Sequence, residues 1–153
     1  MKLSDILAPE NVLCGVSVAS KKRVLELASE VLAAGGATVP QGVIQDSLIA
    51  RERLGSTGFG HGVAIPHGRV KNLTKAMALF VQLSEPVDYD AIDGQPVDLL
   101  FILAVPEEST DEHLQMLAQL AEMFSDHALC RTLRECQDNE QLHALITGWS
   151  KDH

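Results

Sequence analysis

Two long apolar runs in the second half of the chain constrain its fold more than any other feature of the sequence. Residues 76–83 and 97–105 are almost entirely apolar, and neither run alternates between apolar and polar positions. Strands with this composition are typical of a sheet that is covered on both faces. Residues 90–94 supply turn-forming residues between the two runs. We therefore expect two central strands with other elements packed against both of their faces.

Two amphipathic helices are predicted ahead of these runs. Ser20 is placed to cap the first helix, whose apolar residues recur with helical spacing until Gly35 and Gly36 end it. The second helix is expected to begin with Pro40 in its first turn and to end at Leu54. A short apolar segment on each side of this helical pair is predicted to form a strand: residues 12–18 and residues 63–65.

Three further helices are expected after the second apolar run. Thr110, Asp126 and Asp138 are placed to cap them, because their side-chain oxygens can accept hydrogen bonds from free backbone N–H groups. Helices before and after buried strands predict an α/β fold, a three-layer sandwich in which a mixed β-sheet is flanked by helices on both faces. In the first of these three helices, the stripe that faces the core is predicted to comprise Leu114, Leu117, Ala118, Ala121 and Phe124.

Length, composition and charge narrow the classes of protein to which the chain can belong. With 153 residues, 46% of them hydrophobic, the chain is expected to form one domain over residues 1–153. No apolar run approaches the length of a membrane span and the first residues lack a signal-peptide core, so we expect a cytoplasmic protein without membrane insertion. The net charge of −9 argues against binding to nucleic acid, and the basic residues 21–23 are interpreted as a solvated helix turn. The three cysteines lack Cys-x-x-Cys spacing and are interpreted as free thiols.

Residues 55–62 hold four glycines in eight positions, and no regular element is expected there. Ser56 and Thr57 lie in this segment, so it can offer hydroxyls and backbone N–H groups to phosphate oxygens. The segment is not a Walker A loop, because no Gly-Lys-Ser/Thr follows. It is not a dinucleotide-binding fingerprint either, because its glycines do not open a helix after a strand. When such a loop stands alone, a purely structural turn is the favoured interpretation.

Two histidines stand in positions suited to phosphoryl chemistry. His67 follows the predicted strand at 63–65 and Pro66, so its imidazole is expected to be displayed at a strand end, where it can act as a nucleophile. His113 lies in the first turn of a predicted helix, where the helix dipole favours a neutral imidazole and attracts anions. An ordinary surface histidine is the alternative for each. Zinc could use these two with His61, but no carboxylate or thiol has ligand-like spacing, so no metal site is predicted.

Five segments of the sequence resemble one known family. Residues 51–58 (Arg-Glu-Arg-Leu-Gly-Ser-Thr-Gly) and 62–68 (Gly-Val-Ala-Ile-Pro-His-Gly) resemble the active-site signature of the fructose/mannitol class of IIA components of the phosphotransferase system, or PTS. Residues 20–23, 90–101 and 113–117 resemble the nitrogen-regulatory branch of that family. The likeness covers nearly the whole chain, and it implies a single IIA domain of the second type with a mixed sheet between helices.

The resemblance implies a role for each candidate residue. His67 would be the phosphorylated residue, His113 would donate a hydrogen bond across the active site, and Arg51 would pair with phosphoryl oxygens. No cofactor is implied. Phe59 and Val63 are expected to form the apolar centre of a docking surface around the phosphorylated histidine, and packing of Phe59 into the core is the alternative. The segment that the resemblance places in the same phosphate pocket comprises Ser56, Thr57 and Gly58.

The implied reaction is phosphoryl transfer onto His67 from the histidine phosphocarrier protein of the nitrogen branch, which receives its phosphate from phosphoenolpyruvate through an enzyme I. The resulting phosphohistidine would regulate target proteins, with sensor kinases or potassium transporters as the expected targets. One alternative is a sugar-transport IIA component that passes phosphate to a separate IIB protein. Another is a binding module in which His67 is structural. The nitrogen-branch segments favour the regulatory carrier, and whether such a PTS component counts as an enzyme is left open.

Overall fold

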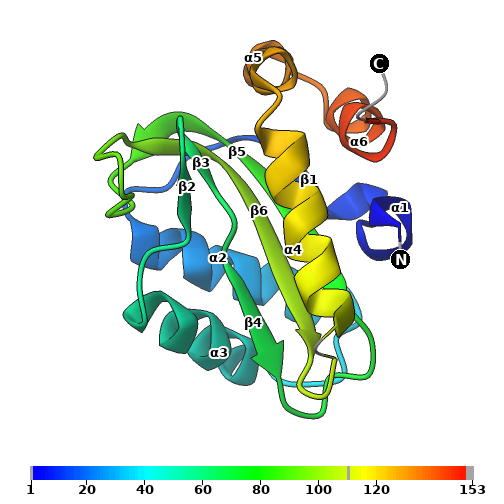
Figure 1. Cartoon of the computed structure of the whole chain (residues 1–153). Helices are drawn as coiled ribbons and strands as arrows, with labels where there is room; N and C mark the ends of the chain where they lie inside the picture. The colour runs from blue at the N-terminus through cyan, green and yellow to red at the C-terminus, as the bar shows by residue number, and fades with distance from the viewer. Residues whose placement is uncertain (1, 110, 151–153) are drawn as a thin grey trace.

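A mixed β-sheet between two groups of helices makes up the computed structural model, which describes residues 2–109 and 111–150 (Figure 1). Within these residues the sheet has six strands, which are β1 (Val12–Val16), β2 (Gly58–Gly60), β3 (Val63–Ala64), β4 (His67–Val70), β5 (Met77–Val87) and β6 (Val97–Pro106). The helical elements are α1 (Leu3–Ile6), the 3₁₀ turn η1 (Pro9–Asn11), α2 (Lys21–Ala34), α3 (Gln41–Arg53), α4 (Asp111–Phe124), α5 (His127–Glu135) and α6 (Asn139–Thr147).

The two predicted central strands, β5 and β6, pair with each other in the middle of the sheet. Their antiparallel register places Phe80 opposite Phe101, and the strand order is β1-β5-β6-β3-β2. Strand β1 is parallel to β5, and β3 and β4 both run parallel to β6 at successive positions along it. The strands predicted at 76–83 and 97–105 are therefore confirmed, and the strand predicted at 12–18 is confirmed as the shorter β1.

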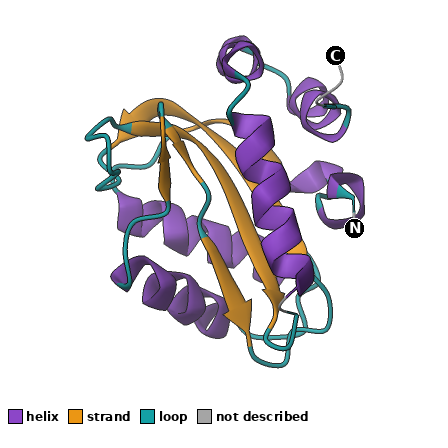
Figure 2. Cartoon of the chain, in the orientation of Figure 1, coloured by secondary structure: helices purple, strands orange, loops and turns teal. Residues whose placement is uncertain are grey.

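Alternate residues of β5 and β6 fill two separate core layers. Phe80 and Phe101 face the layer of α1, α4, α5 and α6, whereas Leu79 and Ile102 face α2 and α3. All four side chains are fully buried, because neighbouring residues of a strand point to opposite faces and both faces are covered. Figure 2 shows helices on both sides of the sheet, so the predicted three-layer α/β arrangement is confirmed.

The predicted helix starts that lie within the described residues are confirmed to within one residue. The Ser20 hydroxyl accepts a hydrogen bond at 3.2 Å from a backbone N–H in the first turn of α2. Pro40 itself caps α3 with an extended backbone, so its predicted place in the first turn is wrong by one position. Asp126 and Asp138 cap α5 and α6 as predicted, whereas Thr110 lies outside the described residues. No helix in the described part of the chain combines the length and the apolar character that crossing a bilayer requires.

The predicted core stripe of α4 is displaced. Leu114 is 61% exposed, Ala118 is exposed as well, and Leu117 is only partly buried. Apolar periodicity misplaces the stripe because a histidine takes one of the core positions, and a search for apolar residues passes over it. The buried face of α4 consists of His113, Met116, Leu120, Met123 and Phe124.

The glycine-rich segment contains a strand that its composition does not indicate. Gly58 pairs with Ala64 in an antiparallel β2–β3 ladder, so the expectation of no regular element is wrong for residues 58–60. Strand β4 is likewise absent from the sequence-based prediction. Its first residue stands between Pro66 and Gly68, and both residue types are depleted in strands.

Candidate active site

His67 begins β4, where it lies opposite Leu103 of β6. The backbone N–H of Leu103 donates a hydrogen bond to the carbonyl of Pro66 at 2.9 Å, which fixes the residue just before the histidine. His67 therefore does not follow the end of a strand, as the sequence suggested, but occupies the start of one. Its side chain is partly buried and has polar partners at both ring nitrogens.

These two partners determine the tautomer of the His67 imidazole. Nδ1 lies 2.8 Å from the carbonyl oxygen of Ile65, and Nε2 lies 3.2 Å from Nε of Arg51. A carbonyl only accepts hydrogen bonds and a guanidinium only donates them, so Nδ1 carries the proton and Nε2 presents a lone pair. Burial lowers the pKa of His67 below its ordinary value, and the Arg51 charge lowers it further against the opposing effect of the Ile65 bond. The ring is therefore neutral at pH 7, with Nε2 as its nucleophilic nitrogen.

Arg51, in the last turn of α3, connects His67 to the glycine-rich segment. Its Nε donates to His67, and its Nη1 donates to the carbonyl oxygen of Gly55 at 2.9 Å. The planar fork of a guanidinium matches the spacing of phosphate oxygens. The structure thus places a permanent cation of suitable geometry directly at the nucleophilic nitrogen.

Gly68 allows α3 to pack directly on β4. A Cβ atom at this position would collide with the hydroxyl oxygen of Ser47 and would lie 3.3 Å from the Ser47 backbone. The same hydroxyl donates to the carbonyl oxygen of Arg69 at 2.7 Å, which ties the helix to the strand. The glycine next to His67 therefore serves the close approach that brings Arg51 within reach.

Gly68→Ala is expected to lower the free energy of unfolding by about 1–3 kcal/mol, the usual effect of overpacking a filled contact. The added methyl group should also move Arg51 away from His67, and the pKa of His67 should then rise toward its ordinary value. Urea unfolding measures the first effect and NMR titration measures the second. Gly42→Ala is the matched control, since a Cβ atom there meets nothing within 4 Å. An equal loss of stability in both variants would contradict this account.

His113, in the first turn of α4, is buried beside His67. The residue is 6% exposed, and the two imidazole centroids lie 5.3 Å apart in an edge-to-face arrangement. Neither ring nitrogen of His113 has a hydrogen-bond partner among the described residues. Burial, followed by the charges of His67 and Arg69, lowers the pKa of His113 to about 4. The ring is neutral at pH 7, and the alternative of an exposed surface histidine is wrong.

The lowered pKa of His113 should make folding sensitive to acid. The unfolded chain takes up a proton on this residue near pH 6.5, whereas the folded chain does so only near pH 4. The free energy of unfolding should therefore fall by roughly 3 kcal/mol as the pH is lowered from about 6.5 to about 4. Urea titrations across this range would measure the loss, and His113→Gln should reduce it. If the free energy of unfolding depends on pH equally in both proteins, His113 is not the source of the acid sensitivity.

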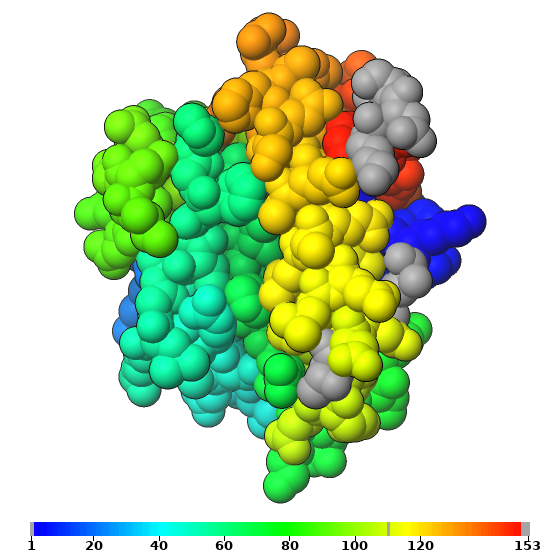
Figure 3. Space-filling view, in the orientation of Figure 1, coloured from blue at the N-terminus to red at the C-terminus, as the bar shows by residue number. Residues whose placement is uncertain are grey.

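A cavity of about 730 Å³ opens onto His67 between α3 and α4. Arg51, His67 and His113 all line this active-site cavity, so the structure brings the three predicted catalytic residues together. Figure 3 shows α4 in yellow beside the cyan and green segments that include α3 and β4. Although the whole chain has a net charge of −9, cations outnumber carboxylates in the lining, because Arg69 and Lys71 join Arg51 there and Glu107 alone opposes them. The cavity can therefore hold an anionic group next to a neutral nucleophile.

Three exposed apolar side chains form what we call the apolar rim of the active-site cavity. They are Val43, Leu54 and Leu114, which are 39%, 85% and 61% exposed. The sequence suggested Phe59 and Val63 for this surface, but neither residue lines the cavity. Val63 is fully buried because β3 is an interior strand, whereas Phe59 is 39% exposed but lies outside the cavity lining. The apolar rim comes from α3, its C-cap residue and α4.

Ser56, Thr57 and Gly58 are not among the residues that line the active-site cavity. The Ser56 hydroxyl donates to the carbonyl of Tyr89 at 2.9 Å and accepts from the Gly58 N–H at 3.0 Å. Thr57 binds the Glu52 carboxylate through its backbone N–H, at 3.1 Å, and through its hydroxyl. These groups hold the loop against its own neighbours, and the phosphate contacts expected of them stay a prediction.

Glu52 is an anchor that the sequence pattern does not single out. Its carboxylate is nearly buried, pairs with the Lys21 ammonium at 3.0 Å and accepts from the Tyr89 hydroxyl at 3.2 Å. Lys21 also lies 4.6 Å from the centre of the Tyr89 ring, so the interpretation of residues 21–23 as a solvated turn is wrong for this lysine. By joining α2 to the end of α3, Glu52 fixes the turn that carries Arg51. The sequence offered one signal for Glu52, which is a single acidic residue between two arginines.

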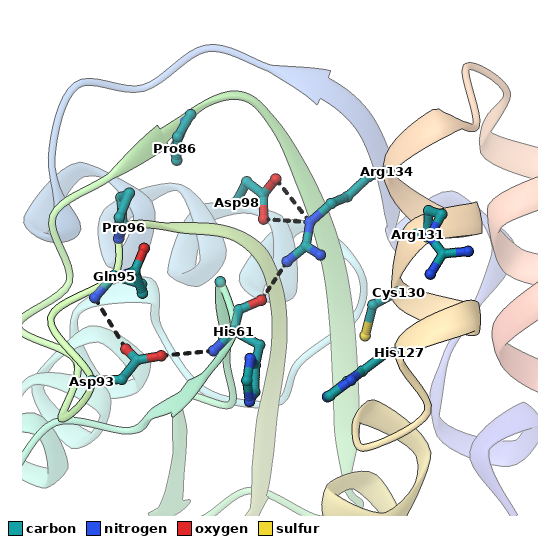
Figure 4. Close-up of a pocket in the computed structure, with 11 residues that line it drawn as sticks. His61, Pro86, Asp93, Gln95, Pro96, Asp98, His127, Cys130, Arg131 and Arg134 are labelled. Atoms are coloured by element: carbon teal, nitrogen blue, oxygen red, sulfur yellow. Dashed lines mark hydrogen bonds and ion pairs between the residues drawn. The ribbon is translucent and has the colours of Figure 1, made fainter.

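A second cavity, of about 740 Å³, lies near the other end of β6 (Figure 4). There Nε of Arg134 donates to both carboxylate oxygens of Asp98, at 3.0 and 3.1 Å, and Nη2 donates to the His61 carbonyl at 2.6 Å. The rings of His61 and His127 are 4.6 Å apart, but the described residues contain no group of three or more candidate metal ligands. Asp98 lies five residues before Leu103, the β6 partner of His67, or about 16 Å along the strand. This cavity is therefore separate from the one at His67.

Comparison with known proteins identifies the family to which the chain corresponds. A family model described as "Phosphoenolpyruvate-dependent sugar phosphotransferase system, EIIA 2" matches residues 5–149. The chain belongs to this family. The resemblance to PTS IIA components noted in the sequence is thereby confirmed.

Individual relatives of this PTS IIA chain agree with the family assignment. The nitrogen regulatory protein of Escherichia coli (strain K12) is 45% identical over 148 residues, which cover 96% of this chain and 90% of that relative. The crystal structure of nitrogen regulatory protein IIA-Ntr from Neisseria meningitidis matches with a TM-score of 0.89 and 41% identity, over 94% of this chain and 97% of that one. The crystal structure of IIA mannitol from Escherichia coli matches with a TM-score of 0.78 and 25% identity, over 91% and 97%. These similarities confirm the fold and the likeness to the nitrogen-regulatory branch.

Proposed function

We propose that this PTS IIA chain is a regulatory phosphoryl carrier that accepts a phosphoryl group on Nε2 of His67 from a histidine phosphocarrier protein. The observation that carries the proposal is the tautomer of His67. The Ile65 carbonyl holds the proton on Nδ1, so Nε2 has a lone pair beside a cation in a cavity suited to an anion. Family membership supports a PTS role, and the identity to nitrogen regulatory proteins supports a regulatory one.

In the proposed step, the Nε2 lone pair of His67 attacks the phosphorus of the carrier's phosphohistidine. A nitrogen–phosphorus bond forms at Nε2 while the one in the carrier breaks, and that electron pair returns to the carrier's imidazole nitrogen. The proton stays on Nδ1, whose N–H keeps donating a hydrogen bond to the Ile65 carbonyl, and this bond stabilises the positive charge that develops on the ring. Transfers of this kind depend on positioning and charge stabilisation more than on covalent chemistry.

Arg51 and His113 are proposed to stabilise the phosphoryl group without being phosphorylated. Arg51 donates to Nε2 of His67 in the unphosphorylated protein, so it has to turn from this nitrogen to the phosphoryl oxygens during transfer. His113 is neutral and carries one N–H, which can donate to a phosphoryl oxygen when it faces the active-site cavity. A role in anchoring the loop beyond Arg51 is proposed for three further residues: Ser56, Thr57 and Gly58.

The apolar rim is proposed as the docking surface for the phosphocarrier protein. Leu114→Asp should raise the carrier concentration needed for half-maximal transfer on the order of tenfold, because it puts a charge into the dry centre of a small interface. The rate at saturating carrier should change little, since His67 and Arg51 are untouched. Ile92→Asp is the matched control, because Ile92 is 93% exposed but does not line the cavity. Equal effects of both variants in a phosphoryl-transfer assay would show that the rim is not the docking surface.

Phosphorylation is proposed to release regulatory targets that bind over the same rim. The phosphoryl group adds about −1.5 to −2 charges at His67, and a target that covers the rim would bury this charge without a partner. Sensor kinases and potassium transporters are the proposed target classes. A target bound to another face of the chain should not distinguish the two forms.

A sugar-transport role is the second candidate function, in which the phosphoryl group passes on from His67 to a separate IIB protein. The family model and the similarity to IIA mannitol favour it, whereas the higher identity to nitrogen regulatory proteins favours the regulatory role. A binding module with a structural His67 is the third candidate.

Incubation with enzyme I, the phosphocarrier protein and labelled phosphoenolpyruvate tests the proposed function. Acid-labile label on the chain is expected, and an unlabelled chain would favour the binding module. A second arm adds candidate IIB proteins, and rapid loss of label to one of them would favour the sugar-transport role. A third arm compares target binding by the labelled and bare forms with and without excess carrier. Targets that bind both forms equally would contradict the proposed release mechanism.

A further inference from the structure

Residues 52–57, which end α3 and lead toward β2, form a turn that one carboxylate closes. We call it the Glu52 turn. The Glu52 side chain is 6% exposed and accepts hydrogen bonds from the backbone N–H of Thr57, at 3.1 Å, and from the Thr57 hydroxyl. Both bonds join the first residue of the turn to its last. The Gly55 N–H also donates to the Glu52 carbonyl at 3.1 Å, so the path of the backbone between the two ends is fixed.

The Glu52 turn holds the guanidinium of Arg51 at a second point. The carbonyl of Gly55 accepts from Nη1 of Arg51 at 2.9 Å, while Nε donates to Nε2 of His67 at 3.2 Å. Two hydrogen bonds at different atoms of a planar group determine its orientation. Gly55 has a φ of +149°, which L side chains rarely adopt, so the path of the turn decides where this carbonyl points. A change in that path would therefore move the guanidinium relative to His67.

Tyr89, which lies between β5 and β6, contacts the Glu52 turn through two of its atoms. Its hydroxyl donates to the Glu52 carboxylate at 3.2 Å, and its carbonyl accepts from the Ser56 hydroxyl at 2.9 Å. The side chain is fully buried. Burial and the Glu52 charge raise the pKa of Tyr89 above its ordinary value, so the hydroxyl keeps its proton and stays a donor. Tyr89 therefore stabilises the closed turn without adding a charge to it.

Four donors meet at the Glu52 carboxylate. They are the N–H and the hydroxyl of Thr57, the Tyr89 hydroxyl, and the Lys21 ammonium at 3.0 Å. An ionised carboxylate only accepts hydrogen bonds and has about four sites for them, so these donors match its capacity. The Lys21 charge also compensates the nearly buried anion. The arrangement is therefore fully paired, and the loss of one donor should loosen the turn.

We propose that Glu52 and Tyr89 are positioning residues for phosphoryl transfer, because they close the turn whose Gly55 carbonyl orients the Arg51 guanidinium at Nε2 of His67. Neither residue lines the active-site cavity, so both act through Arg51. With Nη1 held at Gly55, the guanidinium keeps one fixed point while Nε leaves His67 for a phosphoryl oxygen. The inference rests on the proposed function, in which Arg51 stabilises the phosphoryl group.

Tyr89→Phe tests the proposal, because it removes the hydroxyl that donates to Glu52 and keeps the buried ring. Displacement of the Arg51 charge should raise the pKa of His67, which that charge lowers in the unaltered protein. The transfer rate at saturating carrier should fall about two- to tenfold, the effect of one net hydrogen bond. The carrier concentration for half-maximal transfer should not change, because Tyr89 is not part of the apolar rim. NMR titration and phosphoryl-transfer assays measure these quantities.

Ser29→Ala is the matched control. The Ser29 hydroxyl is also fully buried, but it donates to the Leu25 carbonyl within α2 at 2.8 Å and makes no contact with Glu52. Both variants delete one buried hydroxyl, so a purely structural role for Tyr89 predicts the same result in both. Ser29→Ala should leave the pKa of His67 and the transfer rate unchanged. The proposal is overturned if Tyr89→Phe matches this control in both measurements, or if it changes only the concentration for half-maximal transfer.

Thr57→Val provides a second test if Tyr89→Phe does not fold. It replaces the hydroxyl that donates to Glu52 by a methyl group and keeps the backbone N–H. The ¹⁵N–¹⁵N coupling between Nε of Arg51 and Nε2 of His67, which reports their hydrogen bond, should weaken, and the pKa of His67 should rise. An unchanged coupling and an unchanged pKa in the folded variant would overturn the proposal.

The coupling and the pKa are measured in the unphosphorylated protein and do not depend on phosphoryl transfer. A failure of His67 to accept label would refute the proposed function, whereas these two measurements would still decide whether Glu52 and Tyr89 position Arg51.

Discussion

His67→Ala should abolish labelling of the chain when it is incubated with enzyme I, the phosphocarrier protein and labelled phosphoenolpyruvate. The variant lacks the one imidazole whose nucleophilic nitrogen meets a cation in the active-site cavity, and His113 cannot replace it because that ring is buried. The fold should survive, since His67 is only partly buried and belongs to neither core layer. Labelling followed by phosphohistidine analysis, together with circular dichroism of the variant, would measure both effects.

His127→Ala is the control for this experiment. It removes an exposed histidine that lines the separate cavity near Arg134, so its labelling should match that of the unaltered chain. Labelling of His67→Ala at the normal rate would mean that another residue accepts the phosphoryl group.

Arg51→Ala should slow phosphoryl transfer by a factor of about ten to a thousand, the usual effect of losing one charge-stabilising contact. His113→Ala is expected to slow transfer by a factor in the same range, because it removes a hydrogen-bond donor. Removal of the Arg51 charge should also raise the pKa of His67, because that charge lowers it in the unaltered protein. Quenched-flow transfer assays would measure the rates, and NMR titration of the His67 ring would measure the pKa.

Arg53→Ala is the matched control for Arg51. It removes an exposed arginine two residues along the same helix that does not line the active-site cavity. Its transfer rate and the His67 titration should be unchanged. If Arg51→Ala and His113→Ala both transfer at the control rate, neither residue contacts the phosphoryl group.

The parts of the fold that could be predicted are those that depend on local signals. The buried strands β5 and β6 follow from uninterrupted apolar runs, and the starts of α2, α5 and α6 follow from capping residues. The register of α4 could not be predicted in this way. Its core stripe depends on burying His113, and only the contact with the sheet shows that a polar residue takes that position.

The residues of the candidate site also separate into those that the sequence predicts and those that depend on contacts in the folded chain. His67 and Arg51 could be picked out in the sequence, because the segments that hold them resemble the signature of PTS IIA components. The Glu52 anchor was not, since it depends on partners from α2 and from the segment before β6 that meet only in the folded chain. The same contacts explain why the Thr57 hydroxyl is turned toward Glu52 and does not reach the active-site cavity.

The burial of His113 has a consequence for how this chain would respond to selection. The residue occupies a core position in α4, in line with Met116 and Leu120, yet it brings two nitrogen atoms there without partners among the described residues. A leucine at this position would keep the apolar stripe and remove both nitrogens, so selection for thermal stability alone should favour it. Selection for phosphoryl transfer should keep the histidine. At position 113, selection for thermal stability and selection for phosphoryl transfer would therefore favour different residues.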